Sequence, residues 1–116
     1  MIRSPDESVV TSVAAFEYSV AAFSDGHLVT VVGEVDLATA PQLADVLTQF
    51  ANGTIRVDIS GVTFLDSAGM RTLLVVHKNA QRAGRRMIVC GDLEPLVQQT
   101  LSITGLDEVL EFDRTA

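Results

Sequence analysis

The sequence contains little cysteine, few aromatic residues and few basic residues. Its single cysteine, Cys90, rules out an intramolecular disulfide and any metal cluster built from cysteines. It has no Trp, one Tyr and five Phe, so no aromatic platform for nucleic-acid bases is indicated. Only 8 Lys and Arg stand against 15 Asp and Glu, a formal net charge of -7, which disfavours nucleic acid and anionic membranes as partners.

Long apolar runs and leader-like features are also lacking. No apolar run approaches the length needed to cross a bilayer. The N-terminal residues include Arg3, Asp6 and Glu7 and have no apolar centre, unlike a secretory signal peptide. A reducing cytoplasm is therefore the expected compartment. Within it, Cys90, which follows the apolar run Met87–Val89, is expected to be a small buried side chain.

The remaining composition is that of one globular domain. A chain of 116 residues is within the usual range for a single domain, and contents of 47% hydrophobic and 20% charged residues are sufficient for a packed core. We expect flexible tails at residues 1–12 and 114–116 around a domain that spans residues 13–113. No internal repeat, linker or low-complexity segment interrupts that span.

Apolar periodicity predicts a small α/β domain. The turn signal Ser24-Asp25-Gly26 separates two strand-like runs, which should pair as an antiparallel hairpin. Helical and strand-like segments alternate after the hairpin, and such alternation implies parallel neighbours. We therefore expect a mixed sheet of four or five strands with about three to four helices. The strands are expected at residues 16–20, 28–32, 54–59, 86–90 and 109–112.

Two longer helices follow from 3.6-residue spacing and from capping signals. The first should begin at Thr39 or Ala40, with Pro41 in its first turn, and end at Asn52-Gly53. The second should run from Ser67 to about Ala83. The apolar stripe of the first comprises Leu43, Val46, Leu47 and Phe50. The broader apolar face of the second comprises Met70, Leu73, Leu74, Val76 and Ala80.

A short third helix is expected after the strand at residues 86–90. It should start within Gly91–Pro95 and end at Gly105. Its side chains Leu96, Val97 and Leu101 are expected to point inward.

The stretch from Phe64 to Leu74 joins the strand at residues 54–59 to the longest helix through a short turn. Asp66 and Ser67 are both N-cap residue types, and a helix N-terminus has backbone N–H groups without partners inside the helix. Ser67 is therefore expected at a sheet-to-helix corner, near solvent and on a rigid support. It is either a plain helix cap or a phosphorylation site, where helix N–H groups would attract the phosphate and Asp66 would repel it.

A catalytic interpretation of Ser67 lacks a base. His27 lies beside the hairpin turn, and His77 lies two to three helical turns beyond Ser67. A serine nucleophile needs a base within hydrogen-bonding reach. We therefore expect Ser67 to be the object of a reaction rather than its agent, and we expect no catalytic residue in this chain.

A metal site and a phosphate-binding loop are the other classes of site considered. Asp36, Asp58 and Asp66 lie near strand ends, and three carboxylates can hold magnesium. Asp58, however, alternates with the apolar residues of its own strand. The glycines are scattered and form neither a dinucleotide-binding nor a Walker pattern. We expect no metal and no cofactor.

Four segments, in order along nearly the whole chain, carry a family resemblance. They are Gly33–Asp36, Val57–Gly69, Met87–Cys90 and Ile103–Leu106, with an Asp-Ser-x-Gly corner at Asp66–Gly69. Together they resemble the STAS domain of bacterial anti-sigma factor antagonists. The resemblance implies the small α/β fold described above.

The resemblance also implies a function. Ser67 would be phosphorylated by a cognate anti-sigma factor that is also a serine kinase. The unphosphorylated form would bind that partner and free the sigma factor, and a serine phosphatase would reverse the modification. The implied contact residues are Asp36, Thr39, Asp66, Ser67, Ala68, Gly69, Met70 and Arg71. Many relatives carry a second hydroxyl residue where this chain has Ala68, so Ser67 is the only hydroxyl at the corner.

Other interpretations stay open beside this one. The chain can be a constitutive STAS adaptor subunit of a transport or membrane complex, or an enzyme with Ser67 as nucleophile. A weak homodimer is also left open. The retained Asp66-Ser67 pair favours the anti-sigma factor antagonist.

Overall fold

The computed structural model describes residues 16–50 and 52–113. The expected tails, 1–12 and 114–116, lie outside the described residues, as do the first three residues of the expected domain. Within the described ranges the elements follow one another as β2 (Phe16–Phe23), β3 (Gly26–Val35), α1 (Ala40–Gln49), β4 (Thr54–Leu65), α2 (Ser67–Arg82), β5 (Met87–Cys90), α3 (Pro95–Thr104), the 3-10 helix η2 (Leu106–Glu108) and β6 (Glu111–Asp113). No helix in these ranges is long and apolar enough to span a membrane.

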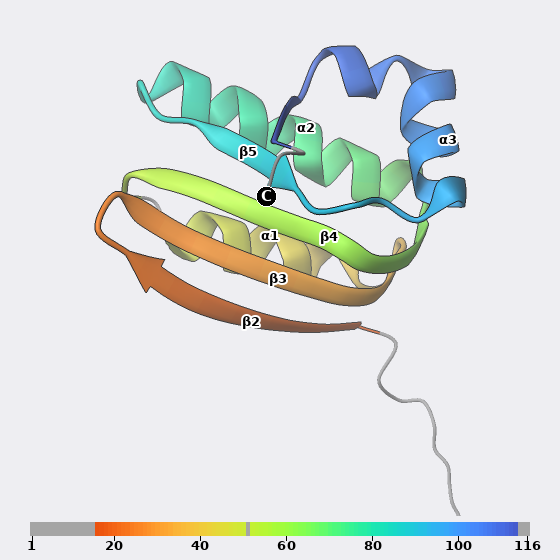
Figure 1. Ribbon diagram of the computed structural model, residues 1–116, viewed down its shortest axis with the longest axis horizontal. Helices are drawn as coiled ribbons and strands as arrows, with labels where there is room; N and C mark the ends of the chain where they lie inside the picture. Colours follow the sequence, from red (N-terminus) through yellow and green to blue (C-terminus); the bar gives the residue numbers. More distant parts are fainter. Residues whose placement is uncertain (1–15, 51, 114–116) are drawn as a thin grey trace, which may run out of the picture.

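The strands form one mixed sheet in the order β2-β3-β4-β5-β6 (Figure 1). β2 and β3 pair antiparallel, and the remaining neighbours pair parallel. The predicted hairpin and mixed sheet are therefore confirmed. The start of β3 requires a glycine at position 26, because a Cβ there would lie 1.8 Å from the carbonyl oxygen of Thr54 on the adjacent strand β4.

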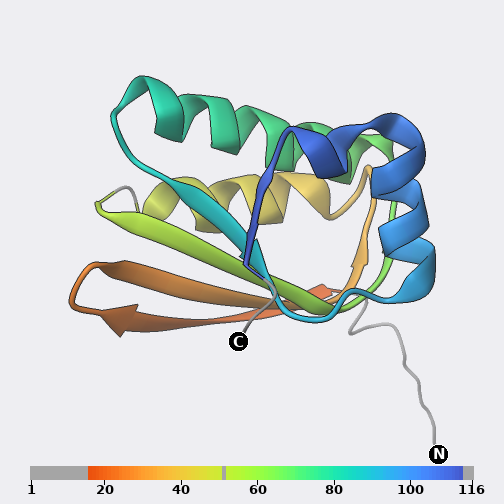
Figure 2. The ribbon, with the colours of Figure 1, turned by 45° about the horizontal axis from the view of Figure 1, so that its top comes forward.

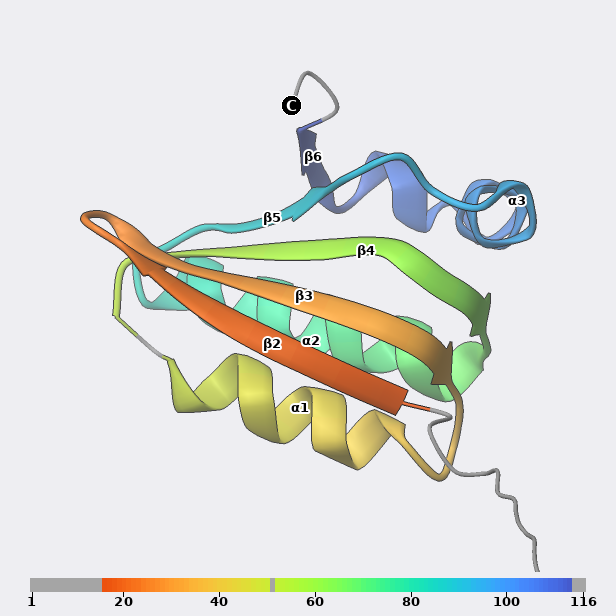
Figure 3. The same cartoon turned by 60° about the horizontal axis from the view of Figure 1, so that its bottom comes forward.

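The core lies between this sheet and the helices α1 and α2, which pack side by side against one of its faces (Figure 3). Alternate residues of β3 and β4 point into the core, as period-2 patterning requires. The buried strand residues include Val29, Val31, Val35, Ile55, Val57, Ile59, Val62 and Leu65. The helices add Leu43, Val46, Leu47, Leu73, Val76 and Ala80. The predicted stripes of both helices are thus confirmed, with Phe50, Met70 and Leu74 partly buried at the margin.

The turn predicted after residue 59 is absent, because β4 continues to Leu65. Its pairing with β3 contains two irregularities, one between Thr30 and Val32 and one between Gly33 and Glu34. At each, β4 carries one more residue than β3, so the extra residues are accommodated as local irregularities within the strand rather than as a turn. Only Asp66 then separates the end of β4 from α2.

The inward orientation predicted for Leu96 is wrong. Val97 and Leu101 are buried as expected, but Leu96 is 70% exposed. Helix α3 packs beside the C-terminal end of β4 rather than flat on the sheet (Figure 2), so it buries only a narrow face. Gly105, at φ 78°, ends the helix as predicted.

Candidate functional site

The corner between β4 and α2 is held by Asp66 rather than by Ser67. The Asp66 carboxylate is the N-cap group, and its Oδ1 accepts hydrogen bonds from the N–H groups of Ala68 at 2.9 Å and Gly69 at 3.1 Å. The backbone N–H of Asp66 donates to the carbonyl oxygen of Val35 at 3.1 Å, which ties the corner to the end of β3. Both ends of the corner are therefore fixed.

Ser67 is the first residue of α2, and its side chain is exposed. Its hydroxyl makes no hydrogen bond to any described residue, whereas the hydroxyl of Thr72, one turn further on, donates to the carbonyl oxygen of Ala68 at 3.1 Å. The expected solvent position of Ser67 is confirmed. Since Asp66 does the capping, the Ser67 hydroxyl is left available.

Gly69 packs inward and does not belong to the exposed part of the corner. It is buried, and a Cβ at this position would lie 2.6 Å from Cδ1 of Leu65 and 2.8 Å from Cγ1 of Val35. The glycine therefore lets α2 start against the ends of β3 and β4, and its expected role as a partner contact stays a prediction. Of the other expected contacts in this turn, Arg71 is exposed and Met70 is partly buried.

The second expected contact segment, Asp36 to Thr39, lies beside the corner, because β3 and β4 end at paired residues. The hydroxyl of Thr39 donates to the carbonyl oxygen of Glu34 at 2.8 Å and accepts from the N–H of Asp36 at 2.9 Å. Asp36 Oδ1 accepts from the N–H groups of Ala38 and Thr39, both at 3.0 Å. Thr39 is only 8% exposed, so it shapes this loop rather than offering a contact surface.

Next to the corner lies an apolar groove that sequence reasoning missed. We call it the α3 groove; it has a volume of about 390 Å³ and lies between the end of β4 and α3. Its lining residues are Thr63, Phe64, Leu65, Leu96, Val97, Gln99, Thr100 and Ile103, and none of them is charged. Phe64, Leu96 and Ile103 are 49%, 70% and 76% exposed. Contiguous exposed apolar side chains of this size mark interaction surfaces.

A signal for the α3 groove is present in the sequence. Pro95–Thr104 contains no charged residue, although the whole chain has a net charge of -7. Leu96, Gln99, Thr100 and Ile103 follow i, i+3, i+4, i+7 spacing, a second stripe beside the buried Val97 and Leu101. Helix α3 therefore has two uncharged faces. Only one of them packs on the sheet, so the other faces solvent.

Neither histidine can act as a base for Ser67. His27 pairs in register with Ile55 near the start of β4, about 30 Å of extended chain from the corner. Its ring packs on Phe50 at a centroid distance of 4.7 Å. His77 is buried in α2, about 15 Å along the helix from Ser67.

The three aspartates considered for magnesium do not meet. Within residues 16–50 and 52–113, no three His, Cys, Asp or Glu side chains come together as metal ligands would. Asp36 and Asp66 each bind backbone amides of their own loops, as described above. Asp58 Oδ1 accepts from the N–H of Ser60 at 2.9 Å, and Asp58 pairs in register with Cys90 on β5.

Cys90 is half-buried rather than fully buried, which corrects the expectation from its apolar neighbours. Its desolvation raises the pKa of the thiol, and the nearby carboxylates of Asp58 and Asp113 raise this pKa further. Only the thiolate is a strong nucleophile, so this cysteine is chemically quiet at neutral pH.

Comparison with known proteins identifies one family. The STAS domain model matches residues 18–116. The anti-sigma-B factor antagonist of Listeria monocytogenes serovar 1/2a is 28% identical over 85 residues, which cover 71% of this chain and 74% of the Listeria protein.

Solved structures share the fold. An anti-sigma factor antagonist from Mycobacterium paratuberculosis superimposes with a TM-score of 0.74 at 22% identity, covering 89% of each chain. The anti-sigma factor antagonist SpoIIAA in its unphosphorylated form superimposes with a TM-score of 0.69 at 18% identity, covering 86% of this chain and 89% of SpoIIAA. The architecture described above is therefore that of these proteins.

Proposed function

Because this chain belongs to the STAS domain family, we propose that it is an anti-sigma factor antagonist switched by phosphorylation of Ser67. In its unphosphorylated form it binds an anti-sigma factor with serine kinase activity in the cytoplasm and so frees the sigma factor. The kinase transfers the γ-phosphoryl group of ATP to Ser67 Oγ, so ADP and the hydroxyl proton leave. A serine phosphatase later hydrolyses the ester. The chain itself is a binding module rather than an enzyme.

The observation that carries this proposal is the state of the Ser67 hydroxyl. It is exposed at a corner whose backbone is fixed by Asp66, and it is not used for capping. No histidine can reach it as a base. These features suit a group that another protein modifies and do not suit a nucleophile.

The proposed partner surface has a polar part and an apolar part. The polar part consists of Asp36 and Arg71 around Ser67, with the apolar Ala68 and Met70 beside them. The apolar part is the α3 groove, whose lining includes Leu65, the residue before Asp66. Thr39, Asp66 and Gly69, expected as contacts, support this surface from within.

Phosphorylation would change the charge of this surface without any need to unfold it. A phosphate adds about -1.5 to -2 charges at neutral pH. It would stand next to the Asp66 carboxylate, which already occupies the N–H groups of Ala68 and Gly69. An anion of this strength, desolvated against a partner, would cancel a few kcal/mol of binding.

The test combines phosphate mapping with binding. The full chain is incubated with ATP and candidate anti-sigma kinases from its own organism, and the phosphate is located by mass spectrometry. We expect one phosphate on Ser67 and none on a Ser67→Ala variant. In binding assays Ser67→Ala should match the parent within about threefold, and Ser67→Glu should bind at least about tenfold more weakly.

Ser19→Glu provides a matched control, because it makes the same change at an exposed position on β2. It should leave binding unchanged. If Ser67→Glu bound the kinase as tightly as the parent, the switch mechanism would be wrong. The constitutive adaptor, for which the α3 groove alone holds a permanent partner, would then be the better interpretation.

A further inference from the structure

Ser67 and Arg71 face the same hollow on the molecular surface. The hollow has a volume of about 270 Å³, and its lining residues are Ser67, Met70, Arg71, Leu74, Thr104 and Leu106. Ser67 and Arg71 are four residues apart on α2, a spacing that places Cβ atoms about 5–6 Å apart on one helix face. Both side chains are exposed, so each is free to move toward the other.

Arg71 is an unpaired cation in the first half of α2. It makes no ion pair and no hydrogen bond to any described residue, whereas Arg56 is bound to Asp25 and Arg86 to Glu111. The other described Lys and Arg residues lie at the start of β4, in the second half of α2 or just after it: Arg56, Lys78, Arg82, Arg85 and Arg86. Among residues 16–50 and 52–113, Arg71 is therefore the one cation near Ser67.

The backbone offers a phosphate on Ser67 little help. The N–H groups of Ala68 and Gly69 are taken by Asp66 Oδ1, and the N–H of Met70 donates to the carbonyl oxygen of Asp66. The same Asp66 carboxylate would repel a phosphate on the next residue. A cation on a nearby side chain would therefore stabilise a phosphate here more than these N–H groups can.

We propose that Arg71 binds the Ser67 phosphate within the same molecule, an inference that rests on the proposed phosphorylation. An anion followed by a cation four residues later is the favourable order on a helix. The planar guanidinium donates two parallel N–H bonds to phosphate oxygens, which a lysine ammonium cannot match. In the unphosphorylated protein, Arg71 is the one described cation at this corner that can bind a partner's carboxylate. Once Arg71 is paired with the phosphate, it is no longer available for that contact.

The experiment measures the second pKa of the phosphate itself. Phosphoserine is incorporated at position 67 of the full chain during translation, and its ³¹P shift is followed against pH at low salt. A bound guanidinium favours the dianion and so lowers this pKa. We expect Arg71→Gln to raise the pKa by about half a unit, as for an exposed ion pair. Arg71→Lys should lie between parent and Arg71→Gln, and 0.5 M NaCl should shrink the difference.

Arg82→Gln is the matched control, because it removes the same charge from an exposed position about 22 Å along the same helix. Its phosphate should titrate as in the parent. If the second pKa of the phosphate in the Arg71→Gln variant were no higher than in the Arg82→Gln variant, the proposal would be overturned. Since the phosphoserine is installed without a kinase, that result would leave the proposed function standing. Conversely, if the candidate kinases did not phosphorylate Ser67, the proposed function would be refuted, but the titration of the installed phosphoserine would be unaffected.

Discussion

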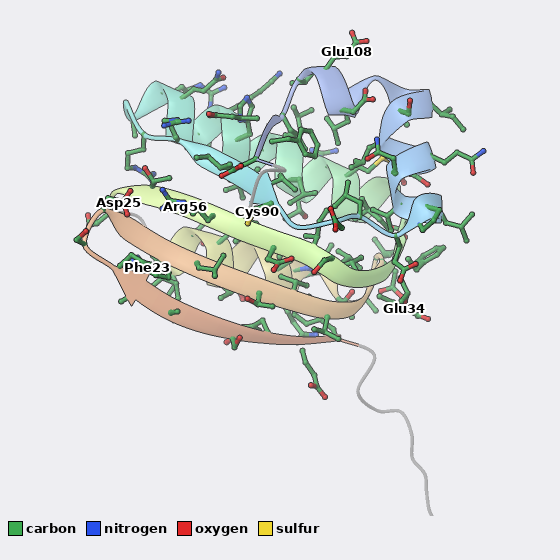
Figure 4. The ribbon with its side chains drawn as sticks, in the orientation of Figure 1. Phe23, Asp25, Glu34, Arg56, Cys90 and Glu108 are labelled. Atoms are coloured by element: carbon green, nitrogen blue, oxygen red, sulfur yellow. The ribbon has the colours of Figure 1, made fainter. Side chains whose placement is uncertain are left out.

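The end of the molecule that carries Ser67 and the end that carries the β2–β3 turn use their charged groups differently. Figure 4 shows Glu34 near the first end, and Phe23, Asp25 and Arg56 at the other. At the turn end, Arg56 and Asp25 are 3.1 Å apart, and Arg86 pairs with Glu111 where β5 begins. The carboxylates of Asp36 and Asp66 instead accept hydrogen bonds from backbone amides of their own loops.

The charged groups at the turn end stabilise the fold by pairing with one another, whereas the Ser67 end leaves side chains exposed to a partner. At the turn end, cations and carboxylates neutralise one another across neighbouring strands. At the Ser67 end, carboxylates rigidify the backbone while apolar side chains and Arg71 face solvent without partners among the described residues. A rigid backbone that carries exposed apolar side chains suits a docking surface, because the backbone then loses little conformational entropy when a partner binds.

The largest expected effect compares one exposed apolar residue from each end. Ile103→Asp places a charge in the α3 groove, and Phe23→Asp makes the same kind of change beside the β2–β3 turn, at a residue that is 54% exposed. We expect Ile103→Asp to weaken binding to the proposed anti-sigma kinase at least about tenfold by calorimetry. Phe23→Asp should stay within about twofold of the parent. Equal losses for both variants would show that the α3 groove has no special role.

A smaller effect is expected for stability, on removing one carboxylate from each end. Asp66→Ala leaves the N–H groups of Ala68 and Gly69 without their acceptor, which should lower the free energy of unfolding by about 1 kcal/mol. Asp25→Ala loses only an exposed ion pair with Arg56 and should cost less. Urea denaturation at neutral pH measures both changes. A larger loss for Asp25→Ala would reverse the comparison between the ends.

The smallest effect concerns acid pH. Arg86 holds the pKa of Glu111 below its usual value, so the pair contributes stability above the unfolded pKa and loses it as pH falls through the folded pKa. Arg86→Gln should therefore make the loss of stability below about pH 5 less steep, as measured by urea melts at several pH values. Arg71→Gln, the same change at the Ser67 end, should leave the slope unchanged. If the free energy of unfolding fell equally steeply with falling pH in the parent and in Arg86→Gln, the Arg86–Glu111 pair would not contribute as stated.

Much of the fold was readable from local pattern. The alternation in β3 and β4 and the stripes of α1 and α2 identified most of the buried residues, because burial on one face imposes a period of 2 or 3.6. The position of Ser67 at a sheet-to-helix corner also followed from the sequence. Local pattern did not reveal that β4 extends past Gly61, since only its parallel pairing with β3 keeps this segment in the sheet.

The errors at the site have a common cause. Thr39 was expected as a contact but is only 8% exposed, and Leu96 was expected to point inward but is 70% exposed. In each case a sequence neighbour has the opposite exposure: Ala38 is exposed beside the buried Thr39, and Val97 is buried beside the exposed Leu96. Motif position identifies the segment, but only the packing partner decides which side of it faces solvent.

The sequence by itself determined the alternation of elements, the core faces and the presence of one exposed hydroxyl after an acid at a helix start. These properties depend on spacing and residue type along a few consecutive turns. The tertiary structure alone decided that Thr104 and Leu106 complete a hollow beside Ser67 and Arg71, and that α3 leaves an uncharged stripe in solvent. Each of these depends on where separate elements meet, and that geometry is set by the packing of the whole sheet.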